Sequence, residues 1–63
     1  MPIIIAHILE GREREKKTAL IRNLTDAVVK TLGVPEDSVR IILSEIEKED
    51  YGIGGKTAKE LGR

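Results

Sequence analysis

The chain has 63 residues, in which eleven Lys and Arg balance eleven Asp and Glu, and it contains one aromatic residue, one His and no Cys. The balanced charge and the scarcity of aromatic side chains argue against nucleic acid as a partner, and a single His without Cys leaves too few ligands for a metal site. No apolar run approaches the roughly 20 residues that span a bilayer, and the N-terminus lacks the pattern of a secretory signal, so we expect a cytoplasmic protein without a membrane partner.

Residues 2–9 predict a β-strand that is apolar on both faces. Because alternate side chains of a strand point to opposite faces, one face carries Pro2, Ile4, Ala6 and Ile8, and the other carries Ile3, Ile5, His7 and Leu9. Two apolar faces are typical of a strand that is covered on both sides, as in parallel sheets. A domain this small is only marginally stable alone, so we expect a helix to cover one face and a second subunit to cover the other.

Residues 10–12 predict a turn, and residues 13–32 predict an amphipathic helix. Its apolar stripe consists of Leu20, Ile21, Leu24, Ala27, Val28, Thr31 and Leu32. Gly33 and Pro35 follow the last apolar position, as is common where a helix ends.

Residues 39–46 predict a second strand. A strand, a helix and a strand in this order form a βαβ unit with a right-handed crossover, so the two strands should be parallel and the fold class α/β. The glycine-rich residues 51–56 predict a tight hairpin or an arm that reaches a neighbouring subunit, and residues 57–63 could add one loose helical turn. We expect a single domain over residues 1–63.

The start of the chain offers an unusual base. Removal of Met1 is expected, because aminopeptidases act on an initiator Met that precedes Pro, and it would leave Pro2 with a secondary amine. The ordinary pKa of an α-amino group lies slightly above neutrality, and nearby guanidinium groups and an apolar pocket would lower the pKa of this amine. Such a group suits proton abstraction next to a carbonyl. The alternative is that Met-Pro is simply a common way for a protein to begin.

Two arginines could bind a carboxylate near such a base. Arg40 lies in an otherwise apolar strand and shares a face with Ile42, and a guanidinium can grip a carboxylate through two hydrogen bonds and stabilise a developing oxyanion. The alternative for Arg40 is a salt bridge between subunits, to a carboxylate such as Glu45. Arg12 lies in the turn after the first strand, where the alternative is a solvated side chain. Tyr51 could line an apolar pocket or pack in an interface.

Several segments, in order, carry a resemblance to a known family. These are Met1-Pro2, His7-Ile8-Leu9-Glu10-Gly11-Arg12, Leu20-Ile21-Arg22, Ser38-Val39-Arg40 and Tyr51-Gly52-Ile53-Gly54-Gly55. Together they resemble the 4-oxalocrotonate tautomerase family over the whole chain. The resemblance implies a βαβ subunit that pairs into a four-stranded dimer, and three dimers that form a hexamer of identical or mixed chains.

The resemblance also implies an isomerase of aromatic-compound catabolism that needs no cofactor. Its substrate would be an unsaturated dicarboxylic 2-hydroxy acid, such as 2-hydroxymuconate, and its product the conjugated 2-oxo acid. In this scheme Pro2 is the general base and Arg40 holds the near carboxylate and the 2-oxygen. Arg12 binds the far carboxylate, and Tyr51 stands in the pocket where the family commonly has Phe.

Other functions remain open beside this one. Dehalogenases and hydratases resemble the same family, but they add an arginine near the end of the first strand and a glutamate in the tail. Here those positions are Leu9 and Ile53, which cannot activate water, so tautomerase chemistry is favoured. A non-catalytic subunit of an oligomeric or mixed assembly is also possible, because fold and catalysis are separable. A third possibility is that the amine of Pro2 attacks carbonyls as a nucleophile and forms an iminium.

Overall fold

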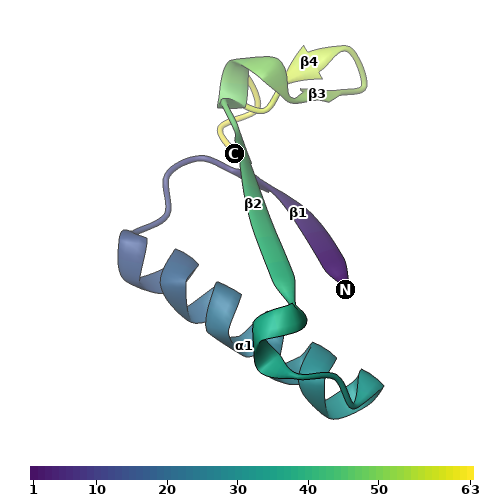
Figure 1. Cartoon of the computed structure of the whole chain (residues 1–63). Helices are drawn as coiled ribbons and strands as arrows, with labels where there is room; N and C mark the ends of the chain where they lie inside the picture. Colours follow the sequence, from purple (N-terminus) through teal and green to yellow (C-terminus); the bar gives the residue numbers. More distant parts are fainter.

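The structure, a computed structural model, describes residues 1–63 (Figure 1). The elements in chain order are β1 (Ile3–Leu9), α1 (Arg14–Leu32), the 3₁₀ turn η1 (Glu36–Ser38), β2 (Arg40–Ile46), the 3₁₀ turn η2 (Lys48–Asp50), β3 (Gly52–Ile53) and β4 (Lys56–Thr57). β1 and β2 form a parallel sheet, and β3 and β4 form an antiparallel hairpin. The predicted βαβ unit with a C-terminal hairpin is confirmed, and β1, α1 and β2 each begin one residue later than the sequence predicts.

The register of the parallel sheet fixes which residues share an end. β1 and β2 pair from Ile3 opposite Arg40 to Leu9 opposite Ile46. The backbone N–H of Arg40 also donates to the carbonyl of Pro2 at 2.9 Å, so the sheet is bonded up to its amino end. Six residue steps of about 3.3 Å separate the two ends of β1, which is about 20 Å.

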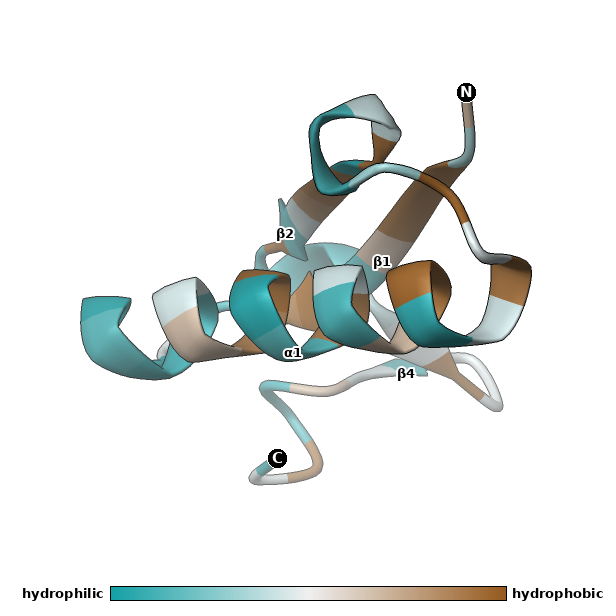
Figure 2. Ribbon diagram, turned by 60° about the horizontal axis from the view of Figure 1, so that its bottom comes forward, coloured by the Kyte–Doolittle hydropathy of each residue, from teal (hydrophilic) through white to brown (hydrophobic).

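One face of this sheet lies against α1 and the other face is open. Ile4 and Ala6 are half-buried on the face that α1 covers, and Lys17 of α1 reaches Glu45 of β2 at 3.1 Å on the same side. On the opposite face the side chains of Ile3, Ile5 and Ile42 are 59%, 56% and 49% exposed, respectively. In Figure 2 most of β1 is coloured as hydrophobic, whereas hydrophobic and hydrophilic colours alternate along α1.

The predicted apolar stripe of α1 is only partly buried. Thr25 and Val28, in the middle of the helix, are buried, whereas Leu32 is 61% exposed and Ile21 is also exposed. These positions are exposed because α1 crosses a sheet of only two strands at an angle, so the sheet covers only part of the stripe (Figure 1). Thr25 is buried although it is polar because its hydroxyl donates to the carbonyl of Ile21 at 2.8 Å.

Glycines with positive φ lie at the end of α1 and in the turn between β3 and β4. Gly33 ends α1 in the left-handed conformation at φ 68° and donates its N–H to the carbonyl of Val29, as expected for a helix C-cap. Gly54 and Gly55 join β3 to β4 at φ 60° and 88°, which is the geometry a two-residue hairpin requires. Residues 58–62 form consecutive turns, and Ala58, the first of them, is fully buried.

The subunit is elongated, with extents of 42 × 23 × 13 Å and a radius of gyration of 14.6 Å. It exposes 4825 Å² of surface, and only three of its 63 residues are buried. No helix in it combines the length and the apolar character needed to cross a bilayer.

Candidate active site

Pro2 and Arg40 lie together at the amino end of the sheet. Pro2 is half-buried and precedes β1, and its carbonyl accepts the backbone N–H of Arg40. Met1 is 79% exposed beyond it, so the peptide bond that an aminopeptidase would cleave is accessible. While Met1 is attached, the nitrogen of Pro2 is a tertiary amide without a basic lone pair; its removal would create the amine at this end of the sheet.

The guanidinium of Arg40 is held by one nitrogen and free at the other two. Nη1 donates to the carbonyl of Asp37 at 2.6 Å and, more weakly, to the carbonyl of Val39 at 3.4 Å. Nε and Nη2 have no partner in the chain. These two nitrogens form one edge of the planar group, which can bind both oxygens of a carboxylate.

The expected position of Arg40 on the sheet agrees with the register. Arg40 and Ile42 share the open face, and Glu45 lies on the opposite face, where it is paired with Lys17. A salt bridge between Arg40 and Glu45 is therefore not formed within the chain.

Arg12 repeats the arrangement of Arg40 at the other end of the sheet. Its Nη1 donates to the carbonyl of Leu9 at 2.9 Å, three residues earlier in the chain, just as Nη1 of Arg40 reaches the carbonyl of Asp37, also three residues earlier. Nε and Nη2 of Arg12 likewise have no partner. Both arginines thus present a free edge while one nitrogen fixes the side chain.

Tyr51 lies on the same side of the molecule as Arg12. It follows η2, its side chain is 40% exposed, and its carbonyl accepts the N–H of Ala58 at 2.8 Å. The carboxylate of Glu10, in the turn before Arg12, accepts the N–H of Lys48 at 3.1 Å. This bond ties the turn that carries Arg12 to the segment that leads into Tyr51.

The four predicted site residues therefore form two pairs at opposite ends of one subunit. Pro2 and Arg40 occupy the amino end, whereas Arg12 and Tyr51 follow the carboxyl ends of β1 and β2, about 20 Å away. A small dicarboxylate is much shorter than this separation. A site that used all four residues would have to combine the two ends from different copies of the chain.

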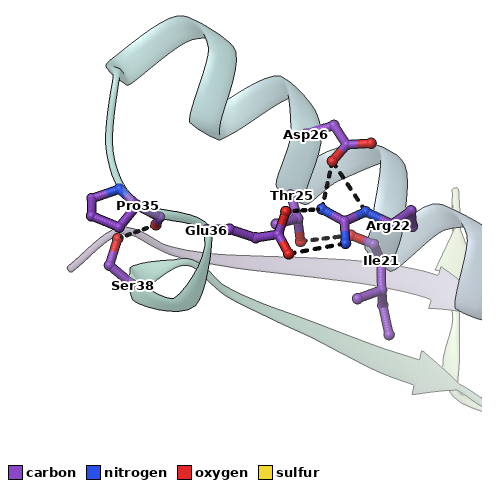
Figure 3. A network of polar contacts seen from close by, with 7 residues as sticks. All are labelled: Ile21, Arg22, Thr25, Asp26, Pro35, Glu36 and Ser38. Atoms are coloured by element: carbon purple, nitrogen blue, oxygen red, sulfur yellow. Dashed lines mark hydrogen bonds and ion pairs between the residues drawn. The ribbon is translucent and has the colours of Figure 1, made fainter.

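Sequence reasoning missed a polar network around Arg22, which joins α1 to η1 (Figure 3). Arg22 is bonded both to Glu36 and to Asp26, and the hydrogen bonds to these two carboxylates raise the pKa of Arg22 above its ordinary value. The four-residue spacing of Arg22 and Asp26 is a recognisable helix pair. The link to Glu36 has no sequence signal, because it depends on how the chain folds back after Gly33.

Comparisons with known proteins agree on one family. The family model described as tautomerase enzyme matches residues 2–60. A 2-hydroxymuconate tautomerase of Stutzerimonas stutzeri is 49% identical over 63 residues, which is all of both chains. A solved structure of the 4-oxalocrotonate tautomerase isozymes from Methylibium petroleiphilum superposes with a TM-score of 0.92 at 41% identity, covering 97% of this chain and 95% of that chain.

A second solved structure, a heterohexamer 4-oxalocrotonate tautomerase from Chloroflexus aurantiacus J-10-fl, gives a TM-score of 0.90 at 34% identity, over 97% of this chain and 98% of that chain. With this fold and these similarities over its full length, the chain belongs to the tautomerase family and is an isomerase with the 4-oxalocrotonate tautomerase fold.

Proposed function

We propose that the chain, once Met1 is removed, is a cofactor-independent tautomerase that converts a 2-hydroxymuconate-like enol to its conjugated 2-oxo isomer. The proposal is supported by the position of Pro2 and Arg40 at the same end of the sheet, where their backbones share a hydrogen bond and Nε and Nη2 of Arg40 have no partner in the chain. The full-length similarity to a 2-hydroxymuconate tautomerase supports the choice of substrate class.

In the proposed reaction one proton moves and no atom is gained or lost. The amine of Pro2 takes the proton of the 2-hydroxyl group, the electrons of the O–H bond shift into the conjugated chain, and the protonated amine returns the proton to a carbon farther along it. The edge of Arg40 binds the near carboxylate and the 2-oxygen and stabilises the charge that develops there. Arg12 binds the far carboxylate, so two cations face a doubly anionic substrate.

In an assembly that brings Arg40 and Arg12 close to Pro2, their guanidinium groups would also favour the base form of its amine. Positive charge close to an ammonium group lowers its pKa, so a larger fraction of the amine is unprotonated at neutral pH. Tyr51 would line the pocket, and its hydroxyl can hydrogen-bond substrate or solvent.

The proposal includes assembly into an oligomer, with a hexamer of identical chains as the expected form. The open sheet face with Ile3, Ile5 and Ile42 offers an apolar surface for another copy. An assembly also allows Arg12 and Tyr51 of one copy to approach Pro2 and Arg40 of another. Native mass spectrometry of the protein from its own source shows whether the oligomer contains identical chains or, like the heterohexamer relative, different ones.

Three variants of the processed protein test the assignment with 2-hydroxymuconate as substrate. Arg40→Ala should lower kcat by about 10²- to 10³-fold, as expected when a group that stabilises the transition-state charge is removed. Arg12→Ala should mainly raise KM, because it removes binding, and Pro2→Ala should lose only part of the rate, because a primary amine remains. Parental rates in all three variants would show that the assignment is wrong.

Water-adding chemistry is disfavoured by two residues. Leu9 and Ile53 occupy the positions where the hydratases and dehalogenases that resemble this family carry an arginine and a glutamate, and neither side chain can polarise water. We expect no halide release from a 3-haloacrylate. If the amine of Pro2 forms an iminium with an aldehyde, borohydride reduces it to a covalent adduct, whereas acid–base catalysis gives no adduct. If the isomerisation of 2-hydroxymuconate is no faster with the protein than in buffer, the chain has a non-catalytic role.

A further inference from the structure

Arg22 makes four hydrogen bonds to two carboxylates (Figure 3). Its Nη1 and Nη2 donate to the two oxygens of Glu36 at 3.3 and 2.8 Å, and its Nε and Nη2 donate to one oxygen of Asp26 at 3.1 and 2.5 Å. Asp26 lies one turn along the same helix, whereas Glu36 is the first residue of η1. Of the bonds that Arg22 makes, only those to Glu36 therefore connect α1 to another element.

η1 is a turn that is closed by its own hydrogen bonds. The N–H of Ser38 donates to the carbonyl of Pro35 at 3.1 Å, the hydroxyl of Ser38 donates to the same carbonyl at 2.7 Å, and the N–H of Val39 donates to the carbonyl of Glu36 at 3.2 Å. The carbonyl of Asp37, in the middle of this turn, holds Nη1 of Arg40.

These contacts form a continuous path from α1 to the candidate catalytic arginine. We propose that Arg22 is a positioning residue: through Glu36 it fixes η1, so that the carbonyl of Asp37 orients Arg40 with its Nε and Nη2 edge free for the substrate. The inference rests on the proposed role of Arg40. Exposed ion pairs contribute little to the free energy of unfolding. The ion pair between Arg22 and Glu36 would therefore affect kcat more clearly than it affects stability.

The chain supplies a matched control for this proposal. Glu36→Gln replaces the ion pair between Arg22 and η1 with a weaker neutral hydrogen bond, and Arg22→Gln removes that ion pair. Asp26→Asn weakens in the same way an ion pair of the same arginine that stays within α1. With 2-hydroxymuconate, the first two variants should lower kcat about three- to tenfold with little change in KM, since a misplaced but present group costs less than an absent one. Asp26→Asn should stay within about twofold of the parent, and Arg22→Lys should recover part of the loss because one ion pair is retained.

A double-mutant cycle with Arg40 shows whether the effect passes through that residue. If it does, adding Glu36→Gln to Arg40→Ala lowers kcat no further. Independent, multiplicative losses would overturn the inference, as would parental kcat in Glu36→Gln or an equal loss in Asp26→Asn. Parental kcat in Arg40→Ala alone would instead overturn the proposed function. Circular dichroism and size-exclusion chromatography identify any variant that fails to fold or assemble. If Arg22→Gln fails to fold or assemble, the kcat of Glu36→Gln alone tests the inference.

Discussion

At the scale of single residues, the proposed chemistry depends on the protonation of one nitrogen. The amine of Pro2 acts as a base only when it is unprotonated, so activity should be lost as pH falls through its pKa. We expect kcat/KM to rise with pH from the acid side and then level off, because the unprotonated fraction of the amine rises in the same way. A pH profile of the processed protein checks this, and a flat acid limb would contradict it.

The shared anchoring of Arg40 and Arg12 leads to a prediction about their side-chain type. Each guanidinium uses Nη1 for a backbone carbonyl and keeps the Nε and Nη2 edge free. Lysine has a single nitrogen and cannot be anchored and bind a carboxylate at two points at once. Arg40→Lys should therefore lower kcat by about tenfold or more. Steady-state kinetics with 2-hydroxymuconate measure the loss, and full activity in Arg40→Lys would show that charge alone suffices.

At the scale of elements, the end of α1 depends on a left-handed residue. Gly33 has φ 68° and open space around its Cβ position, so alanine there would suffer backbone strain without a steric clash. Gly33→Ala should lower the free energy of unfolding by about 1 kcal/mol. The control is Gly52→Ala, which also meets open space but has no positive φ. Urea unfolding at one protein concentration measures both, and equal stability of the two variants would contradict the prediction.

The elements themselves follow from sequence periodicity, whereas contacts between them do not. The short apolar run of residues 2–9 and the helical stripe before Gly33 place β1 and α1 to within one residue. The exposure of Leu32 could not be predicted, because it depends on the angle at which α1 crosses a narrow sheet.

The candidate site shows the same division. Its four residues come from the sequence and from the family resemblance. Their separation into two pairs follows from the register, and the anchoring of Arg40 by the carbonyl of Asp37 depends on the path of η1. Every residue has a backbone carbonyl, so the sequence does not indicate which carbonyl binds Arg40. The ion pair between Arg22 and Glu36 could not be predicted either, because it depends on how the chain folds back after α1.

At the scale of the whole molecule, one subunit is too open to be a compact monomer. Scaling rules give about 4,000 Å² of exposed surface for a folded chain of this mass and a radius of gyration of about 11 Å. The subunit exposes 4825 Å² and has a radius of gyration of 14.6 Å. The excess is what is expected of a chain that is stabilised by contacts with other copies.

The open sheet face is the surface on which assembly should depend most. Ile5 lies opposite Ile42 at its centre, and burying each such side chain stabilises an interface by about 2 kcal/mol. Ile5→Glu should dissociate the oligomer, as measured by size-exclusion chromatography with light scattering, and activity should fall with it. Thr18→Glu, on the exposed side of α1, is the control and should leave assembly intact. An unchanged oligomer in Ile5→Glu would place the interface elsewhere.

The most direct measurement compares two forms of the same chain that differ only in Met1. Inhibiting methionine aminopeptidase during expression yields the form that retains Met1, and expression without the inhibitor yields the form that begins at Pro2. The intact mass distinguishes the two forms, and both are assayed with 2-hydroxymuconate. The form that begins at Pro2 should isomerise the enol rapidly, and the form that retains Met1 should be indistinguishable from buffer, because its Pro2 nitrogen is an amide. Equal activity of the two forms would contradict the role of Pro2 as the base.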